Sequence, residues 1–144
     1  MDLLTEDQAR ALVRRELEAR GWTSLGEAPG HEPGVDLKMS RGDDLLLMEV
    51  KGLTSGDSGS ARHGQSMRVQ QRRHNVAEAV YTACVLRSAH PEAYVAIGLP
   101  EDAPMRGRID AVADVLERLA IAVLWASPSG HVTGELLAPG ERHS

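Results

Sequence analysis

Hydrophobic residues recur at helical spacing in three stretches of the chain. Residues 5–20 begin with Thr5 as a helix N-cap, have two acids in the first turn and end before Gly21. Residues 69–89 and 108–120 carry two further apolar stripes, the first of which ends before Pro91. The sequence therefore predicts three helices. The stripes contain Val69, Val76, Ala77, Val80, Ala83 and Cys84 in the second helix, and Ile109, Val112, Val115, Leu116 and Leu119 in the third.

Shorter apolar stretches predict strands between these helices. Residues 35–40 and 44–51 predict a hairpin joined across Arg41, Gly42 and Asp43, and residues 94–99 and 121–127 predict two buried strands. Residues 22–28 and 131–137 are weaker strand candidates. This order predicts an α/β fold with a mixed sheet flanked by helices. Because 144 residues is a usual length for one domain, we expect residues 1–144 to form a single domain with a polar C-terminal tail.

The predicted hairpin brings charged residues together at one end. A two-residue turn at Gly42 and Asp43 pairs Asp36 with Glu49, whose Cβ atoms would lie about 5 Å apart. Lys51 lies two residues beyond Glu49 and therefore on the same face of the sheet. A change of register by one residue would move Glu49 to the other face, so the cluster depends on the turn. The opposite face, against a helix, would carry Leu37, Met39, Leu46, Met48 and Val50.

Two carboxylates beside an amine suit a divalent cation that acts on phosphate. Mg²⁺ prefers oxygen ligands, so Asp36 and Glu49, with the carbonyl of Val50, would form a sufficient site together with substrate oxygens. Lys51 would position the attacking water, neutralise developing charge or, with a lowered pKa, act as a base. The alternative is a surface hairpin with a Glu/Lys pair. Two facts favour a functional site. The chain has two lysines beside fourteen arginines, so a lysine at this position is less expected by chance, and Glu49 lies in an apolar run, where a charge needs a partner.

These residues resemble a known motif. With GVD, a turn and LLLMEVKG, preceded by a helix that ends in GW and followed by a loop and a helix, the chain resembles the PD-(D/E)XK nuclease superfamily over roughly residues 5–127. The resemblance implies a restriction endonuclease-like three-layer sandwich and phosphodiester hydrolysis with Mg²⁺ or Mn²⁺. It also implies that Asp36 and Glu49 hold the metal and that Lys51 assists the nucleophile. Val35 stands where the superfamily usually has proline, and Pro33 lies two residues further back.

The resemblance suggests further candidates on the helices. Some members of the superfamily add an acid from the first helix, for which Glu6 is the candidate and Glu16 the competitor; a solvated helix face is the alternative for either. Some members place a glutamine on the helix after the lysine. Gln70 fits that place, as a catalytic residue that would contact phosphate or the metal-bound water. It lies seven residues before Ala77, so it is expected on the sheet-facing stripe. A polar residue at a helix start is the alternative for Gln70.

A local positive charge interrupts an acidic chain. The net charge is -5, which argues against a protein that coats nucleic acid indiscriminately, yet residues 51–73 carry five basic residues and one acid. This segment, which includes a Gly/Ser-rich loop at 53–67, is a candidate polyanion site, with a solvated loop as the alternative. Aromatic residues make up 3% of the chain, which gives base stacking little support. The predicted phosphate contacts are Arg62, His63, Arg68, Arg72, Arg73 and His74.

The remaining features narrow the class of protein. Cys84 is the only cysteine, which excludes an internal disulfide and a thiolate zinc site, and we expect it to be a buried thiol. No apolar run approaches the roughly 18 residues that span a bilayer, and the first residues do not resemble an export signal, so a cytoplasmic protein is expected. The predicted function is a metal-dependent DNA endonuclease of the restriction, repair or junction-cleaving type, with a homodimer or a larger protein partner. The alternatives are a catalytically inactive module that binds nucleic acid or protein, and a plain protein-interaction domain.

Overall fold

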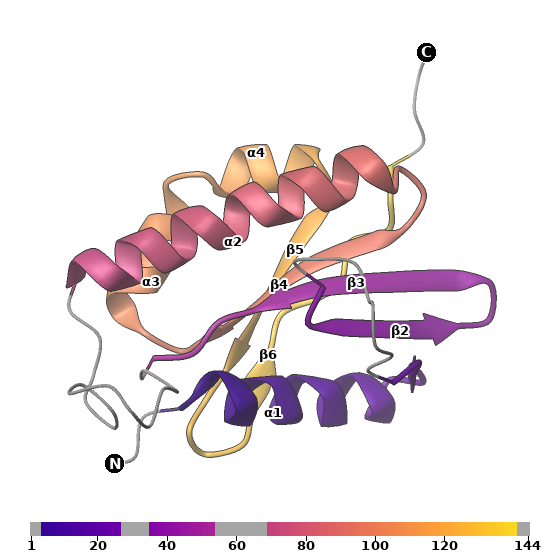
Figure 1. Ribbon diagram of the computed structural model, residues 1–144, viewed down its shortest axis with the longest axis horizontal. Helices are drawn as coiled ribbons and strands as arrows, with labels where there is room; N and C mark the ends of the chain where they lie inside the picture. The colour runs from indigo at the N-terminus through magenta and orange to yellow at the C-terminus, as the bar shows by residue number, and fades with distance from the viewer. Residues whose placement is uncertain (1–3, 27–34, 54–68, 141–144) are drawn as a thin grey trace.

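The computed structural model describes residues 4–26, 35–53 and 69–140. Within these ranges the chain forms a six-stranded mixed sheet whose strands follow one another in chain order (Figure 1). The strands are β1 Thr23–Ser24, β2 Leu37–Arg41, β3 Asp44–Val50, β4 Tyr94–Pro100, β5 Ile121–Ala126 and β6 Val132–Thr133. β3, β4 and β5 are parallel, whereas β1–β2, β2–β3 and β5–β6 pair antiparallel. The predicted α/β class and mixed sheet are confirmed.

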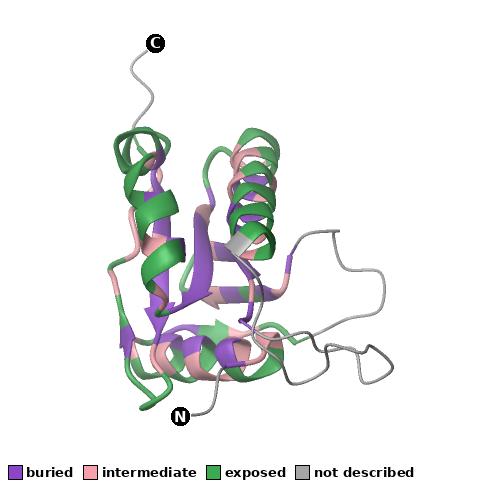
Figure 2. Cartoon of the chain, turned by 90° about the vertical axis from the view of Figure 1, so that its left-hand side faces the viewer, coloured by how far each residue is buried: buried purple, intermediate pink, exposed green. Residues whose placement is uncertain are grey.

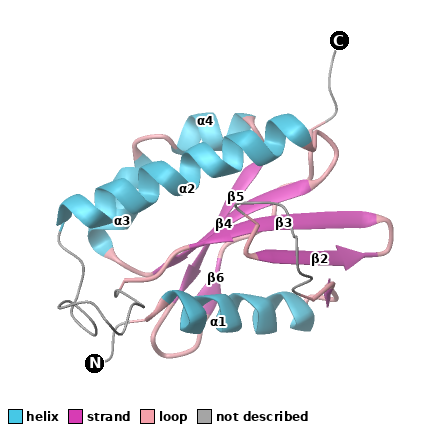
Figure 3. Ribbon diagram, viewed as in Figure 1, coloured by secondary structure: helices cyan, strands magenta, loops and turns pink. Residues whose placement is uncertain are grey.

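Helices cover both faces of the sheet (Figure 3). They are α1 Glu6–Ala19, α2 Val69–Ala89, α3 Ala103–Asp110 and α4 Ala113–Arg118. The helix α1 packs on one face of the sheet, and α2, α3 and α4 pack on the other (Figure 1). The buried positions therefore concentrate on the strands and on the inner sides of the helices, as Figure 2 shows in purple. The sheet divides the core into two apolar clusters, one for each helical layer.

The start of α1 forms as the sequence predicts. Thr5 Oγ1 accepts a hydrogen bond from the Gln8 backbone N–H at 3.1 Å, and Gln8 Oε1 accepts one from the Thr5 N–H at 2.9 Å. This reciprocal capping box satisfies two N–H groups that the helix leaves without partners. At the other end, Gly21 has a φ of 98°, a left-handed conformation that ends the helix. The caps fix which residue begins α1, and that residue is Glu6.

The prediction of one continuous helix over residues 108–120 is wrong. Two short helices replace it, because Asp102 caps α3, which begins at Ala103, five residues before the predicted start at 108, and the helix is interrupted at Val112, where φ is -120°. Ile109, Val112 and Leu116 pack into the core at helical spacing, and Val115 and Leu119 lie outside this stripe. Val115 and Leu119 are therefore exposed, by 55% and 37%, although the pattern predicts them to be buried. Leu116 is the buried residue of α4.

The predicted set of buried residues in α2 is also partly wrong. Ala77 is exposed, while Ala79 and Leu86 are buried together with Val76 and Ala83. These buried positions lie three, four and three residues apart, which is helical spacing. Alanine carries little burial signal of its own, so the pattern cannot decide between two alanines that are two residues apart. Cys84, predicted to be buried, is half-buried at the edge of this stripe.

The end of the hairpin makes a close approach to the start of α1. The Leu53 N–H donates to the Leu4 carbonyl at 2.8 Å, and Gly52 is buried between them and the helix. A Cβ atom at Gly52 would lie 2.6 Å from the carbonyl carbon of Thr5 and 2.8 Å from the Cα of Glu6. Neither backbone atom can move away easily, so glycine is what allows β3 and α1 to meet here.

We predict that Gly52→Ala destabilises the protein by about 2 kcal/mol or more, because the added methyl group would overlap the backbone of α1. In thermal unfolding this corresponds to a Tm about 4 °C or more below that of the parent. The control is Gly107→Ala in α3, where an added Cβ meets nothing within 4 Å and helix propensity favours alanine. Equal Tm values for the two variants would contradict the close approach.

Candidate functional site

The hairpin register places the two predicted acids together. Leu37 pairs with Met48 and Arg41 with Asp44, so the predicted register is confirmed within β2. The ladder ends at the Leu37–Met48 pair, one residue before the predicted pairing of Asp36 with Glu49. Asp36 lies immediately before β2, and its N–H donates to the Met48 carbonyl at 2.7 Å. Its carboxylate Oδ2 accepts a hydrogen bond from the backbone N–H of Val50 at 2.8 Å. The Asp36 carboxylate is therefore anchored on the backbone beside Glu49.

Glu49 is the unusual residue of this cluster. Among the residues that the structure describes, it is the only buried charged side chain, with 6% of its surface exposed. It lies in β3 beside Ile97 of the parallel strand β4. Burial first and then the Asp36 carboxylate raise the pKa of Glu49 to about 7, against the opposing effect of Lys51. The Glu49 carboxyl group therefore changes from its neutral to its ionised form near neutral pH.

Lys51 joins two carboxylates from different elements. Its Nζ lies 3.2 Å from Glu49 Oε1 and 2.6 Å from Oε1 of Glu78, a residue of α2. The side chain of Lys51 is 13% exposed. Burial alone would lower the pKa of Lys51, but the hydrogen bond to Glu78 and the charge of Glu49 outweigh it, so the pKa is raised. Lys51 is thus an ammonium ion at neutral pH, which suits charge stabilisation rather than the role of a base.

Of the two acids predicted from α1, the structure places Glu6 at this cluster. Burial and the Asp36 carboxylate raise the pKa of Glu6, whereas Lys51 lowers it. Glu16 lies ten residues further along α1, about 15 Å away at the rise of a helix. Its carboxylate Oε2 accepts a hydrogen bond from Arg20 Nε at 2.7 Å. Glu16 is therefore a partner of Arg20 at the other end of the helix.

Four of the predicted contact residues lie at the start of α2, and their surroundings differ. Gln70 is exposed and does not share the sheet-facing stripe, because Ala77, the reference for that prediction, is exposed as well. Arg72 is half-buried, and its Nε lies 3.4 Å from Asp102 Oδ2, whereas Arg73 is exposed. His74 Nε2 lies 3.3 Å from Glu78 Oε2. Arg62, His63 and Arg68 lie outside the described residues.

Glu78 is a residue of the cluster that sequence analysis did not single out. It follows Lys51 by 27 positions and reaches it only because α2 packs over β3. A motif of short range cannot contain such a contact. The spacing of His74 and Glu78, four residues apart on one helix, was the available signal, since side chains at that spacing meet.

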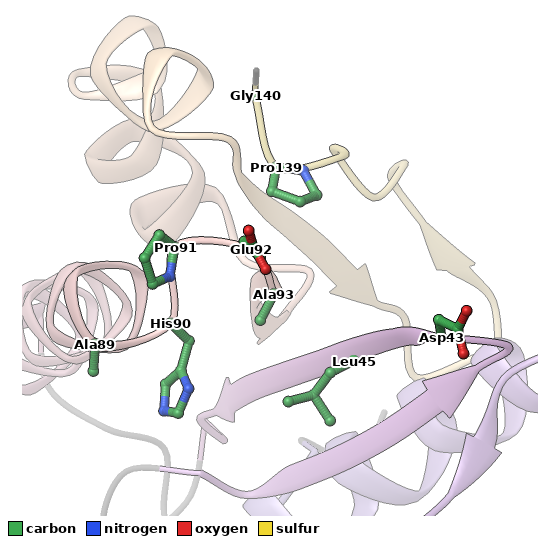
Figure 4. Close-up of a pocket in the computed structure, with 9 residues that line it drawn as sticks. All are labelled: Asp43, Leu45, Ala89, His90, Pro91, Glu92, Ala93, Pro139 and Gly140. Atoms are coloured by element: carbon green, nitrogen blue, oxygen red, sulfur yellow. The ribbon is translucent and has the colours of Figure 1, made fainter. Parts of the chain in front are cut away.

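A pocket of about 800 Å³ lies at the opposite end of the hairpin, and Figure 4 shows the side chains that line it. Leu45 of β3 is one of them, and it precedes Glu49 by four residues, or about 13 Å along a strand. Asp43, His90 and Glu92 supply its ionisable groups. This pocket is therefore separate from the cluster of Glu6, Asp36, Glu49 and Lys51, which we call the acid cluster. A buried carboxylate with other charged side chains around it occurs at Glu49, in the acid cluster.

The ionisable groups of the cluster are mainly carboxylates, whose oxygen atoms are hard metal ligands. Within the described ranges, no group of three or more His, Cys, Asp or Glu side chains is placed to hold a metal ion. A cation at Asp36 and Glu49 would need a backbone carbonyl, waters or phosphate oxygens to complete its ligands, as Mg²⁺ usually does. No helix in the described part of the chain is long and apolar enough to cross a membrane.

Comparisons with known proteins leave the family open. No family model matches the chain, and no curated protein matches it. Among solved structures, the chain is similar to Pyrococcus furiosus SfsA in complex with Ca²⁺, with 13% sequence identity and a TM-score of 0.40. The match covers 94% of this chain and 63% of that one, so the chain spans less than two thirds of the length of that structure. A likeness at this TM-score carries no argument about function.

We predict that Glu49→Gln stabilises the metal-free protein at alkaline pH. The pKa of Glu49 rises on folding from 4.5 to about 7, so folding favours the neutral carboxyl group. Stability from this residue is complete below about pH 4.5 and is lost as the pH rises through 7. At about pH 8 in EDTA, Glu49→Gln should be about 1–3 kcal/mol more stable than the parent, and near pH 4 it should have no advantage.

Thermal or urea unfolding over that pH range measures this difference. Glu16→Gln is the control, because it makes the same chemical change at an acid paired with Arg20. A stability difference between Glu49→Gln and the parent that stays constant with pH would contradict the raised pKa.

Proposed function

We propose that this protein is a metal-dependent nuclease that hydrolyses DNA phosphodiester bonds at the acid cluster. The observation that carries the proposal is the meeting of Asp36, Glu49 and Lys51 at one end of the hairpin, with Glu49 buried. The resemblance of GVD and LLLMEVKG to the PD-(D/E)XK superfamily supports the same assignment. On this proposal, residues 1–144 act as one restriction endonuclease-like domain.

The residues of the cluster fit a divalent cation such as Mg²⁺ or Mn²⁺. Glu6, Asp36 and Glu49 repel one another, which helps to raise the pKa of both glutamates, and Lys51 offsets this repulsion only in part. Asp36 and Glu49, with the carbonyl of Val50, would hold the ion, and Glu6 would add negative charge beside Asp36. When bound, the ion supplies Lewis-acid stabilisation of the charge that develops on the phosphate.

The other residues have roles of their own. Lys51, as an ammonium ion, would stabilise negative charge on the phosphate and orient the attacking water. Gln70, Arg72, Arg73 and His74 lie in the first turns of α2, the part of the helix that leads to Glu78 and Lys51. We propose these four residues, with Arg62, His63 and Arg68, as contacts to the DNA backbone, which would position the strand without reading its sequence.

A second copy of the chain or a larger protein partner would be required to cut both strands of a specific site. The cluster offers one group of acids, and one such group acts on one phosphodiester at a time. We therefore propose a homodimer or a heteromeric complex for double-strand cleavage, with DNA as the shared substrate.

The alternative is a catalytically inactive module of the same fold that binds nucleic acid or protein. One observation favours it: the described acids do not form a group of three or more side chains placed to hold a metal. Such a module would retain the fold and the basic residues but would bind no cation at Asp36 and Glu49.

We predict cleavage of plasmid or branched DNA by the purified protein with Mg²⁺ or Mn²⁺, and none in EDTA. Asp36→Asn, Glu49→Gln and Lys51→Met should each reduce the rate about 100-fold or more, because each removes a charge that acts on the transition state. Glu16→Gln should cut at the parental rate. Parental rates in all three site variants would show that the cleavage arises elsewhere.

We predict that Mn²⁺ raises the Tm of the parent near neutral pH. An ion that binds only the folded state stabilises it by about 2.7 kcal/mol at one hundred times its Kd. Asp36→Asn and Glu49→Gln should lose this shift, and Glu16→Gln should keep it. Retention of DNA by a protein that shows neither a Tm shift nor Mn²⁺ binding would favour the inactive module.

A further inference from the structure

The helix α2 contributes the shortest contact that Lys51 makes. Lys51 Nζ lies 2.6 Å from Glu78 Oε1, compared with 3.2 Å from Glu49 Oε1. Glu78 is the more accessible of the two acids, with 49% of its side chain exposed. The ammonium group is thus drawn from the buried strand toward the helix at the surface.

Packing fixes the direction of Glu78. Val76 and Ala79, on either side of it, are buried against the sheet and set the rotation of α2 about its axis. The two carboxylate oxygens of Glu78 then have different partners: Oε1 accepts from Lys51, and Oε2 lies 3.3 Å from His74 Nε2. The hydrogen bond and the charge of Lys51 lower the pKa of Glu78, so the group is a carboxylate at neutral pH. The side chain is therefore oriented from both sides.

We propose that Glu78 is a positioning residue that holds the Lys51 ammonium group between β3 and α2, and thereby leaves the Glu49 carboxylate open to a cation. The proposal rests on the proposed function, since it concerns the same acid cluster. Without Glu78, Lys51 would have Glu49 as its main anionic partner, and a close pair between the two would compete with a cation for the carboxylate oxygens. With Glu78 present, Lys51 is shared, and its charge is held at the outer edge of the cluster, where a phosphate group has access.

The position of the Lys51 amine can be measured directly. The chain has only two lysines, and Lys38 is exposed, so ¹⁵N-lysine labelling gives two side-chain ammonium signals with Lys38 as the reference. In Glu78→Gln the Lys51 Nζ signal should shift and exchange with water faster, and in Glu16→Gln both signals should stay as in the parent. An unchanged Lys51 signal in Glu78→Gln would overturn the inference, whether or not the protein binds metal.

The consequence for the cation is tested by Mn²⁺ titration of the folded protein. Glu78→Gln should weaken Mn²⁺ binding about tenfold, because Lys51 would then pair with Glu49 and compete with the cation for its carboxylate oxygens. Glu78→Asp keeps the charge with a shorter reach and should recover part of the affinity. Glu16→Gln, which removes a carboxylate paired with arginine at 2.7 Å on the other face of the sheet, should have no effect.

A double-mutant cycle identifies the route of the effect. If Glu78 acts through the lysine, Glu78→Gln should change Mn²⁺ affinity in the parent but not in Lys51→Met. An equal loss in both backgrounds, or no loss in either, would overturn the positioning role while the nuclease proposal stands. If the parent binds no Mn²⁺, the proposed function fails, and the ammonium signals alone decide whether Glu78 holds Lys51.

Discussion

The structure depends on how one carboxylate is accommodated in a strand that is covered on both sides. β3 lies inside the sheet between β2 and β4, with Met48 and Val50 packed toward α1 and Leu47 toward α2. Glu49 continues the row of Leu47, so its carboxylate enters the side of the sheet that α2 covers. An ionised group at such a position costs several kcal/mol unless charges or protons compensate it. The apolar neighbours on β3 hold the strand in place, so the cost is expressed in the raised pKa rather than in a displaced strand.

Two local devices bring the other acids to Glu49. The turn at Gly42 fixes the register, and because side chains alternate between faces, a shift of one residue would separate Asp36 from Glu49. Gly52 lets the backbone of α1 approach the end of β3, which sets Glu6 beside Asp36. The carboxylates therefore gather because of a turn and a glycine, both of which are features of the backbone. Places where a sequence departs from a uniform core in this way are commonly functional.

The parts of the site that the sequence predicted are those that depend on local rules. The register followed from a two-residue turn, so Asp36, Glu49 and Lys51 could be grouped in advance, and the start of α1 followed from Thr5 as its N-cap. The parts that it missed depend on contacts between distant segments. Glu78 reaches Lys51 through the packing of α2 on the sheet, which no spacing in the chain encodes.

The same limit applies to the helices, where it left one choice open and caused one error. The choice between Glu6 and Glu16 required the approach at Gly52, and the choice between Ala77 and Ala79 required the rotation of α2. A stripe read along one helix fixes neither. Gln70 was assigned to the sheet-facing side through Ala77, so a single wrong phase moved both residues to the wrong face.

For the proposed reaction on phosphate, the position of Lys51 decides between two uses of its amine. A base must be neutral before it takes a proton, and Lys51 lies between two carboxylates that favour its charged form. The group of the hairpin with a pKa of about 7 is Glu49, but a carboxylate that holds a cation is ionised and weakly basic. The proposed function therefore gives these charges separate roles: Asp36 and Glu49 would provide oxygen atoms for a cation, and Lys51 would provide a fixed positive charge. In the proposed reaction, proton acceptance would therefore fall to a group outside the Glu49–Lys51 pair, such as a phosphate oxygen or solvent at the outer edge, where Glu78 and His74 are exposed.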